Sequence, residues 1–83
     1  LAVAWAKDNI QVNAVLPGWI VTDLTRGIQD ADPDRYDNIG RRIPTGRWGK
    51  PSELAGTAVF LASAASDYVT GATLTVDGGY SVA

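Results

Sequence analysis

The chain has 83 residues and a mass of 8.7 kDa, so it forms one domain at most. Its formal net charge is −2, and its basic residues form no stripe with aromatic residues, which argues against a nucleic-acid-binding surface. The absence of cysteine excludes disulfides, thiol nucleophiles and thiolate metal sites, and we expect a cytoplasmic protein. No apolar run reaches the roughly 20 residues of a membrane-spanning helix, so we expect no membrane partner.

The hydrophobic pattern predicts a helix over residues 1–7, a strand over 10–16, two short helices within 23–43, a helix over 51–63 and a strand over 72–76. The first strand is mostly apolar with no clean polar face, as in a parallel strand that helices cover on both sides. Strand, helix and second strand form a right-handed βαβ crossover in which the segment 23–43 is inserted. The predicted fold class is therefore α/β.

The inserted segment carries its own helix signals. Asp23 is expected to cap a brief helix from Leu24 to about Ile28, and Asp32 and Pro33 are expected to start the next helix. Gly40 costs that second helix about 1 kcal/mol relative to alanine, and the segment is expected to bury little area, so we predict that it is mobile. Acids at positions 30, 32 and 34 resemble the start of a calcium loop, but an arginine at position 35 replaces the required glycine, so we expect no metal site.

Within residues Asn13–Thr22 the sequence changes from an apolar strand to a polar segment that starts a helix. Asn13 needs hydrogen-bond partners in an apolar strand, and we expect it to tie the strand to a neighbouring loop. Pro17 has no N–H and is expected to end the strand pairing. Gly18 has no Cβ, which lets a flat ring approach its backbone, and Thr22 offers a hydroxyl. This is the end of a parallel strand at which open α/β sheets bind ligands, although a simple strand-to-loop turn also fits these residues.

Two further phrases follow: Arg42–Pro51, with the sequence RIPTGRWGKP, and Phe60–Ser63 followed by Asp67–Gly79, with the sequences FLAS and DYVTGATLTVDGG. In this order and spacing the three phrases resemble the C-terminal third of a short-chain dehydrogenase/reductase. The resemblance covers essentially the whole chain, and within the family it is most similar to sugar-acid dehydrogenases of the gluconate and deoxygluconate type. It implies the C-terminal portion of a Rossmann-like, doubly wound parallel sheet. It also implies hydride transfer between NAD or NADP and a secondary alcohol or ketone.

The resemblance also assigns roles to residues of the first phrase. Pro17 and Gly18 would line the face of the nicotinamide ring, and the Thr22 hydroxyl and the Ile20 backbone would hold its carboxamide. For Thr22 the alternative is a solvent-facing helix cap. Trp19 would stand at the border between cofactor and substrate, with a plain packing role as the alternative.

The family's catalytic Ser, Tyr and Lys are expected upstream of Leu1, because no tyrosine of this chain is followed four residues later by lysine. Residues 1–83 are therefore expected to be a C-terminal fragment of one Rossmann-like domain, inactive by itself, with 23–43 as a substrate lid. The family also implies a homo-oligomer, a tetramer that assembles through the helix Pro51–Ser63 and the strand Ala72–Val76. A non-catalytic α/β module that self-assembles through its strand edges is the alternative.

Three arginines have the chemistry to bind an anionic substrate, because a guanidinium pairs with a carboxylate through two hydrogen bonds. They are Arg41, Arg42 and Arg47. We expect instead that they form surface ion pairs with the acids at positions 34, 37 and 67.

Overall fold

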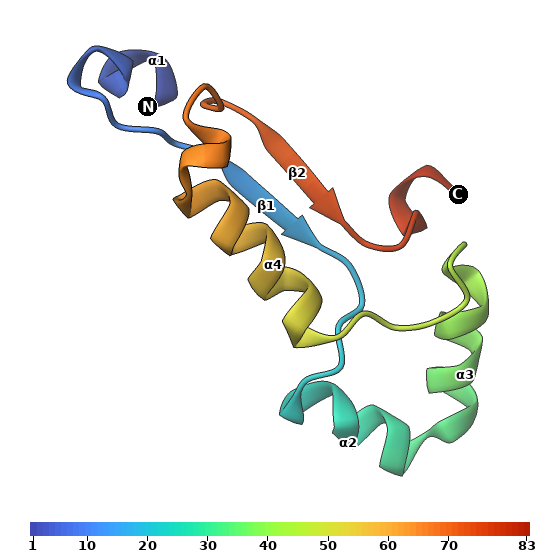
Figure 1. Cartoon of the computed structure of the whole chain (residues 1–83). Coiled ribbons are helices and arrows are strands. Elements are labelled where there is room, and N and C mark those ends of the chain that lie inside the picture. The colour runs from blue at the N-terminus through green and yellow to red at the C-terminus, as the bar shows by residue number, and fades with distance from the viewer.

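The computed structural model describes all residues from 1 to 83. Its elements are α1 (Ala2–Trp5), the 3₁₀ helix η1 (Ala6–Asp8), β1 (Ala14–Pro17), α2 (Asp23–Ala31), α3 (Pro33–Arg42), α4 (Pro51–Ala62), η2 (Ala64–Ser66), β2 (Thr73–Val76) and η3 (Tyr80–Val82). The strands β1 and β2 are parallel neighbours, and α4 runs alongside them (Figure 1). This arrangement confirms the α/β class and the crossover with an inserted helical segment. No helix is both long and apolar enough to cross a membrane.

The first strand is shorter than predicted and starts at Ala14 rather than at position 10. Its partner β2 begins only at Thr73, which pairs with Ala14, so the preceding residues have no strand to pair with. Loop contacts hold them instead. The Val12 N–H donates to the Thr70 hydroxyl at 3.1 Å, and the Gly71 N–H donates to the Val12 carbonyl at 2.8 Å.

Asn13 has the role that the sequence predicts. Its side-chain amide donates to the Val69 carbonyl at 3.1 Å, and its side-chain oxygen accepts a bond from the Ala72 N–H at 2.9 Å. One side chain thus satisfies two backbone groups of the loop that precedes β2, and it fixes where that strand begins.

Pro17 does not end the strand pairing, contrary to expectation. It pairs with Val76, and the next residue, Gly18, still donates its N–H to the Val76 carbonyl at 3.0 Å. In a parallel ladder a residue forms its backbone hydrogen bonds with the two residues on either side of the one it is paired with. Val76 is paired with Pro17 and therefore bonds residues 16 and 18. The missing N–H of Pro17 therefore points away from β2 and removes no bond from this ladder.

The cap of α2 is Thr22 and not Asp23. The Thr22 hydroxyl accepts a bond from the Thr25 N–H at 3.2 Å, and the Thr25 hydroxyl accepts one from the Thr22 N–H at 2.6 Å. This reciprocal cap starts a helix that continues through Gly27 to Ala31, beyond the predicted end. The helix α3 starts as predicted, because the Asp32 carboxylate accepts a bond from the Arg35 N–H at 3.1 Å.

The buried core lies at α3 and not at the sheet. Only 6 of the 83 residues are buried, and three of them, Ile39, Ile43 and Trp48, form one cluster. The segment 23–43 is therefore not uniformly poor in buried area: α3 supplies two buried residues, whereas α2 has none. The second of the two is Gly40, with the Trp48 indole against its backbone.

The outer side of α4 exposes apolar side chains. Val59 is 68% exposed and Phe60 is 40% exposed, and Leu16 of β1 is 51% exposed. A helix that is apolar around its whole circumference is normally covered on more than one side. These 83 residues alone leave α4 and the sheet incompletely covered.

Candidate cofactor and substrate site

The candidate residues follow the carboxyl end of β1, where α2, α3 and the C-terminal segment also gather (Figure 1). In an open α/β sheet this is the end at which loops, rather than paired backbone, present side chains and free N–H groups to a ligand.

Gly18 packs so closely against Asp77 that the structure leaves no room for a side chain at position 18. A Cβ at Gly18 would lie 2.5 Å from the Asp77 Cβ, too close for any other residue. Asp77 in turn organises the turn after β2, as the sequence predicts. Its carboxylate accepts bonds from the N–H groups of Gly79 and Ser81, each at 2.9 Å. Hydrogen bonds from the side chain and backbone of Ser81, and then from Gly79, lower the pKa of Asp77.

Ile20 is buried and forms a single parallel bridge with Gly49. The Gly49 N–H donates to the Trp19 carbonyl and the Val21 N–H donates to the Gly49 carbonyl, both at 2.9 Å. The polar groups of Ile20 itself consequently point to the other side. Its carbonyl accepts a bond from the Thr25 hydroxyl at 2.8 Å, whereas no hydrogen bond uses its N–H.

The Thr22 side chain lies two residues beyond this free N–H and is exposed. Its oxygen accepts the capping bond from Thr25 and keeps further hydrogen-bonding capacity, because a hydroxyl has two lone pairs and a proton. A carboxamide needs a donor for its oxygen and an acceptor for its NH₂. The Ile20 N–H and the Thr22 hydroxyl match these two needs, so the residues fit a nicotinamide. The role of Thr25 was not predicted from the sequence. The signal was present, because Thr22 and Thr25 are three residues apart, which is the spacing of a capping box.

Trp19 lies in a chain of aromatic contacts. Its ring centroid is 5.4 Å from that of Trp48 and 6.4 Å from that of Tyr80, with the Tyr80 ring edge-on. Trp48 is stacked on Tyr36 at 4.6 Å and donates its Nε1–H to the Tyr36 carbonyl at 3.1 Å. The indole of Trp19 is thus packed between the core cluster and the C-terminal segment.

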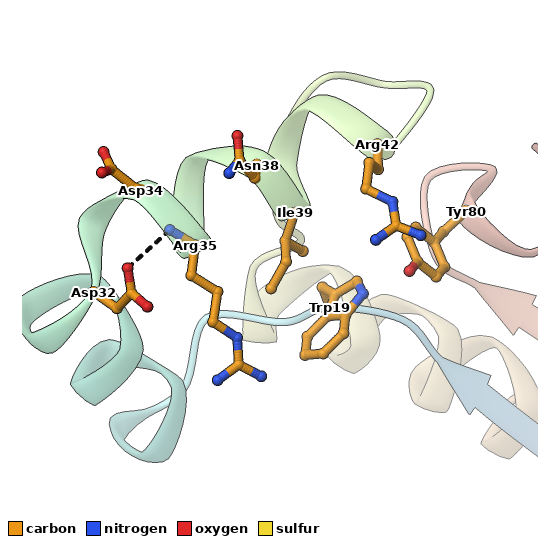
Figure 2. A pocket seen from close by; sticks show the side chains of 8 residues that line it. All are labelled: Trp19, Asp32, Asp34, Arg35, Asn38, Ile39, Arg42 and Tyr80. Atoms are coloured by element: carbon orange, nitrogen blue, oxygen red, sulfur yellow. Dashed lines mark hydrogen bonds between the residues drawn. The ribbon is translucent and has the colours of Figure 1, made fainter.

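A hollow of about 460 Å³ opens beside Trp19, between α3 and the C-terminal segment (Figure 2). Its lining consists of one aromatic pair, one isoleucine, two arginines and three other polar residues: Trp19, Tyr80, Ile39, Arg35, Arg42, Asp32, Asp34 and Asn38. The sequence analysis singled out only Trp19 and Arg42 of these as ligand-binding candidates. Tyr80 joins them because the turn after β2 returns the chain to α3.

The arginines do not form the ion pairs that the sequence predicts. Arg47 is bound to Glu53 by two hydrogen bonds of 2.7 and 2.9 Å, and Arg41 donates to Asn38 at 3.1 Å. Arg42 lies over the ring of Tyr80, with its guanidinium carbon 6.0 Å from the ring centroid. Two of these contacts are local in sequence, and only the contact of Arg42 with Tyr80 joins distant segments of the chain.

The tyrosines of this chain offer no catalytic pair. Tyr36 is followed four residues later by Gly40, Tyr68 by Ala72, and Tyr80 lies within four residues of the last residue. No group of three acidic, histidine or cysteine side chains is placed to hold a metal ion. What the described residues offer is binding and orientation: a free N–H, a hydroxyl, an aromatic wall and two guanidinium groups.

Comparison with known proteins gives the family. The family model described as enoyl-(acyl carrier protein) reductase matches residues 1–81. The chain is 58% identical over 80 residues to 2-dehydro-3-deoxy-D-gluconate 5-dehydrogenase of Dickeya dadantii (strain 3937), covering 96% of this chain and 31% of that protein. It is 46% identical over 82 residues to galactitol 2-dehydrogenase (L-tagatose-forming) of Cereibacter sphaeroides, covering 99% of this chain and 32% of that protein.

A solved structure adds the fold. A gluconate 5-dehydrogenase from Burkholderia cenocepacia J2315, in complex with NADP and tartrate, matches with a TM-score of 0.88 and 49% identity over 99% of this chain and 32% of that one. The chain therefore spans about a third of the length of the relatives it matches. Together with the parallel β1–β2 pair and its crossover, these matches show that the chain belongs to the short-chain dehydrogenase/reductase family and has part of a Rossmann-like fold.

Proposed function

We propose that these 83 residues are the C-terminal part of an NAD(P)-dependent dehydrogenase that interconverts a secondary alcohol of a sugar acid and the corresponding ketone. The matches to relatives about three times as long support this proposal, and a native product of 83 residues would favour a self-assembling module instead. In the oxidative direction the carbinol carbon loses a hydride to C4 of the oxidised nicotinamide, and its hydroxyl proton goes to a base. The products are the ketone, the reduced cofactor and a proton.

The observation that carries the proposal is the free N–H of Ile20 beside the Thr22 hydroxyl, at the carboxyl end of β1. The Ile20 N–H would donate to the carboxamide oxygen of the nicotinamide, and the Thr22 oxygen would accept from its NH₂. Pro17 and Gly18 would border the ring, and Trp19 would separate it from the substrate. The bound cofactor, NAD or NADP, supplies the hydride acceptor or donor.

The segment 23–43 would cover the substrate as a lid. In support, α3 lines the hollow beside Trp19, whereas α2 has no buried residue and is free to move with little loss of packing. The proton chemistry would belong to Ser, Tyr and Lys residues outside this chain, so we expect no turnover from the 83 residues alone.

The test is Thr22→Val in the whole enzyme. Loss of one hydrogen bond costs about 1 kcal/mol, so the cofactor KM should rise or kcat should fall about fivefold. Thr22→Val also removes the cap of α2, so the matched control is Thr25→Val, which weakens the same cap and keeps the Thr22 hydroxyl. Equal effects of the two variants, or no effect of Thr22→Val on cofactor kinetics and binding, would contradict the proposed contact.

A further inference from the structure

Two of the five arginines have no polar partner, and both line the same hollow. Arg26 pairs with Asp23, Arg47 pairs with Glu53, and Arg41 donates to a neighbouring asparagine on α3. The guanidinium groups of Arg35 and Arg42 make no hydrogen bond or ion pair.

The spacing of these two arginines places them together. They are seven residues apart on α3, which is two helical turns or about 10 Å along the axis, and so they share one face. In Figure 2 their guanidinium groups lie on either side of the Trp19 indole, with Ile39 above it. Arg42 is held over the Tyr80 ring, which limits its motion and leaves its N–H groups without a partner.

Two acids also line the hollow, and neither forms an ion pair with these arginines. The Asp32 carboxylate accepts the capping bond from the Arg35 backbone and is part of the helix start. In Figure 2 the Asp34 side chain points away from Trp19, whereas both arginine side chains extend from α3 to the side on which Trp19 lies. The guanidinium groups therefore keep their N–H donors free on the side of the hollow nearest Trp19.

We propose that Arg35 and Arg42 bind the carboxylate of the substrate and thereby select sugar acids over neutral polyols. This inference rests on the proposed function, because Trp19 joins the hollow to Ile20 and Thr22, where the nicotinamide would lie. A planar guanidinium donates two parallel bonds to one carboxylate, and a neutral polyol has no group that replaces this interaction. The aromatic rings of Trp19 and Tyr80 would border the uncharged part of the substrate.

The experiment compares Arg35→Met and Arg42→Met with Arg41→Met in the whole enzyme, using D-gluconate as the acidic substrate and galactitol as the neutral one. Arg41 is the matched control because it lies on the same helix and outside the hollow. We expect the KM for gluconate to rise about ten- to hundredfold in the two hollow variants and to stay unchanged in Arg41→Met. Arg42→Lys should recover part of the affinity, since it keeps the charge and loses the bidentate geometry. Turnover of galactitol and NADP affinity should not change.

Other outcomes separate the two proposals. The carboxylate site alone is overturned if two results occur together. The wild-type enzyme reduces NAD or NADP with gluconate, and the gluconate KM of the hollow variants is unchanged or no higher than that of Arg41→Met. Equal losses on gluconate and galactitol also overturn it. A wild-type enzyme that turns over no sugar acid with either cofactor overturns the proposed function and this inference with it.

Discussion

The guanidinium of Arg47 and the carboxylate of Glu53 meet face to face, with an Nη1–Oε1 distance of 2.7 Å and an Nη2–Oε2 distance of 2.9 Å. Oε1 of Glu53 also accepts a bond from the Lys50 N–H at 3.0 Å and so caps α4. One carboxylate thus joins the loop after α3 to the first turn of α4, next to the bridge between Ile20 and Gly49. This contact couples the start of α4 to the segment that carries the candidate cofactor residues.

The Glu53 contact predicts a specific acid sensitivity. Hydrogen bonds from Arg47 and from the Lys50 backbone lower the pKa of Glu53 from its ordinary value of 4.5 to about 2. A depressed folded-state pKa means that the stability due to the carboxylate is fully present above pH 4.5 and is lost as the pH falls toward 2. Glu53→Gln should therefore lower the Tm of the whole enzyme at about pH 7, and the difference from wild type should shrink below pH 4.5. A difference that stays constant from neutral pH to about pH 3 would contradict this account.

Gly78 should tolerate no side chain, whereas Gly27 should. Gly78 has a φ of 63°, and a Cβ there would clash with the Thr45 hydroxyl oxygen and with the Ile43 side chain. Gly78→Ala should cost about 2 kcal/mol or more, from strain at positive φ and from overpacking. Gly27 lies within α2 with no atom near its Cβ position, so Gly27→Ala should stabilise by about 0.5–1 kcal/mol. Thermal unfolding of both variants tests this prediction. Equal Tm changes would contradict the steric conflict of a Cβ at Gly78 with Thr45 and Ile43.

The exposed side of α4 predicts self-association of the whole enzyme, which we propose to be a tetramer through α4 and β2. Val59 on α4 is 68% exposed, and a charge there should disrupt an interface that a second copy covers. Light scattering should show that Val59→Glu has a lower mass than wild type. Leu24→Glu is the matched control, because Leu24 is 87% exposed but lies on α2, outside the proposed interface. An active wild-type monomer would refute the proposed interface.

Local sequence rules located the elements well where the controlling residues are neighbours in the chain. Asp32 and Pro33 start α3 as predicted, because a cap and a fixed φ act within one turn. The same rules placed the cap of α2 one residue late. A Thr22 cap stood only as the alternative to a cofactor contact, and only the geometry shows that Thr22 and Thr25 bond each other reciprocally.

The sequence by itself determined the family, the α/β crossover and the run from Pro17 to Thr22 as the candidate cofactor segment, because these depend on residue order and local chemistry. The tertiary structure decided the partners of the charged and aromatic side chains. Arg42 lies over the ring of Tyr80, which is distant in sequence, because the turn after β2 brings the chain back to α3. Long side chains pair with whatever the packed backbone brings within reach, and sequence distance carries no record of that.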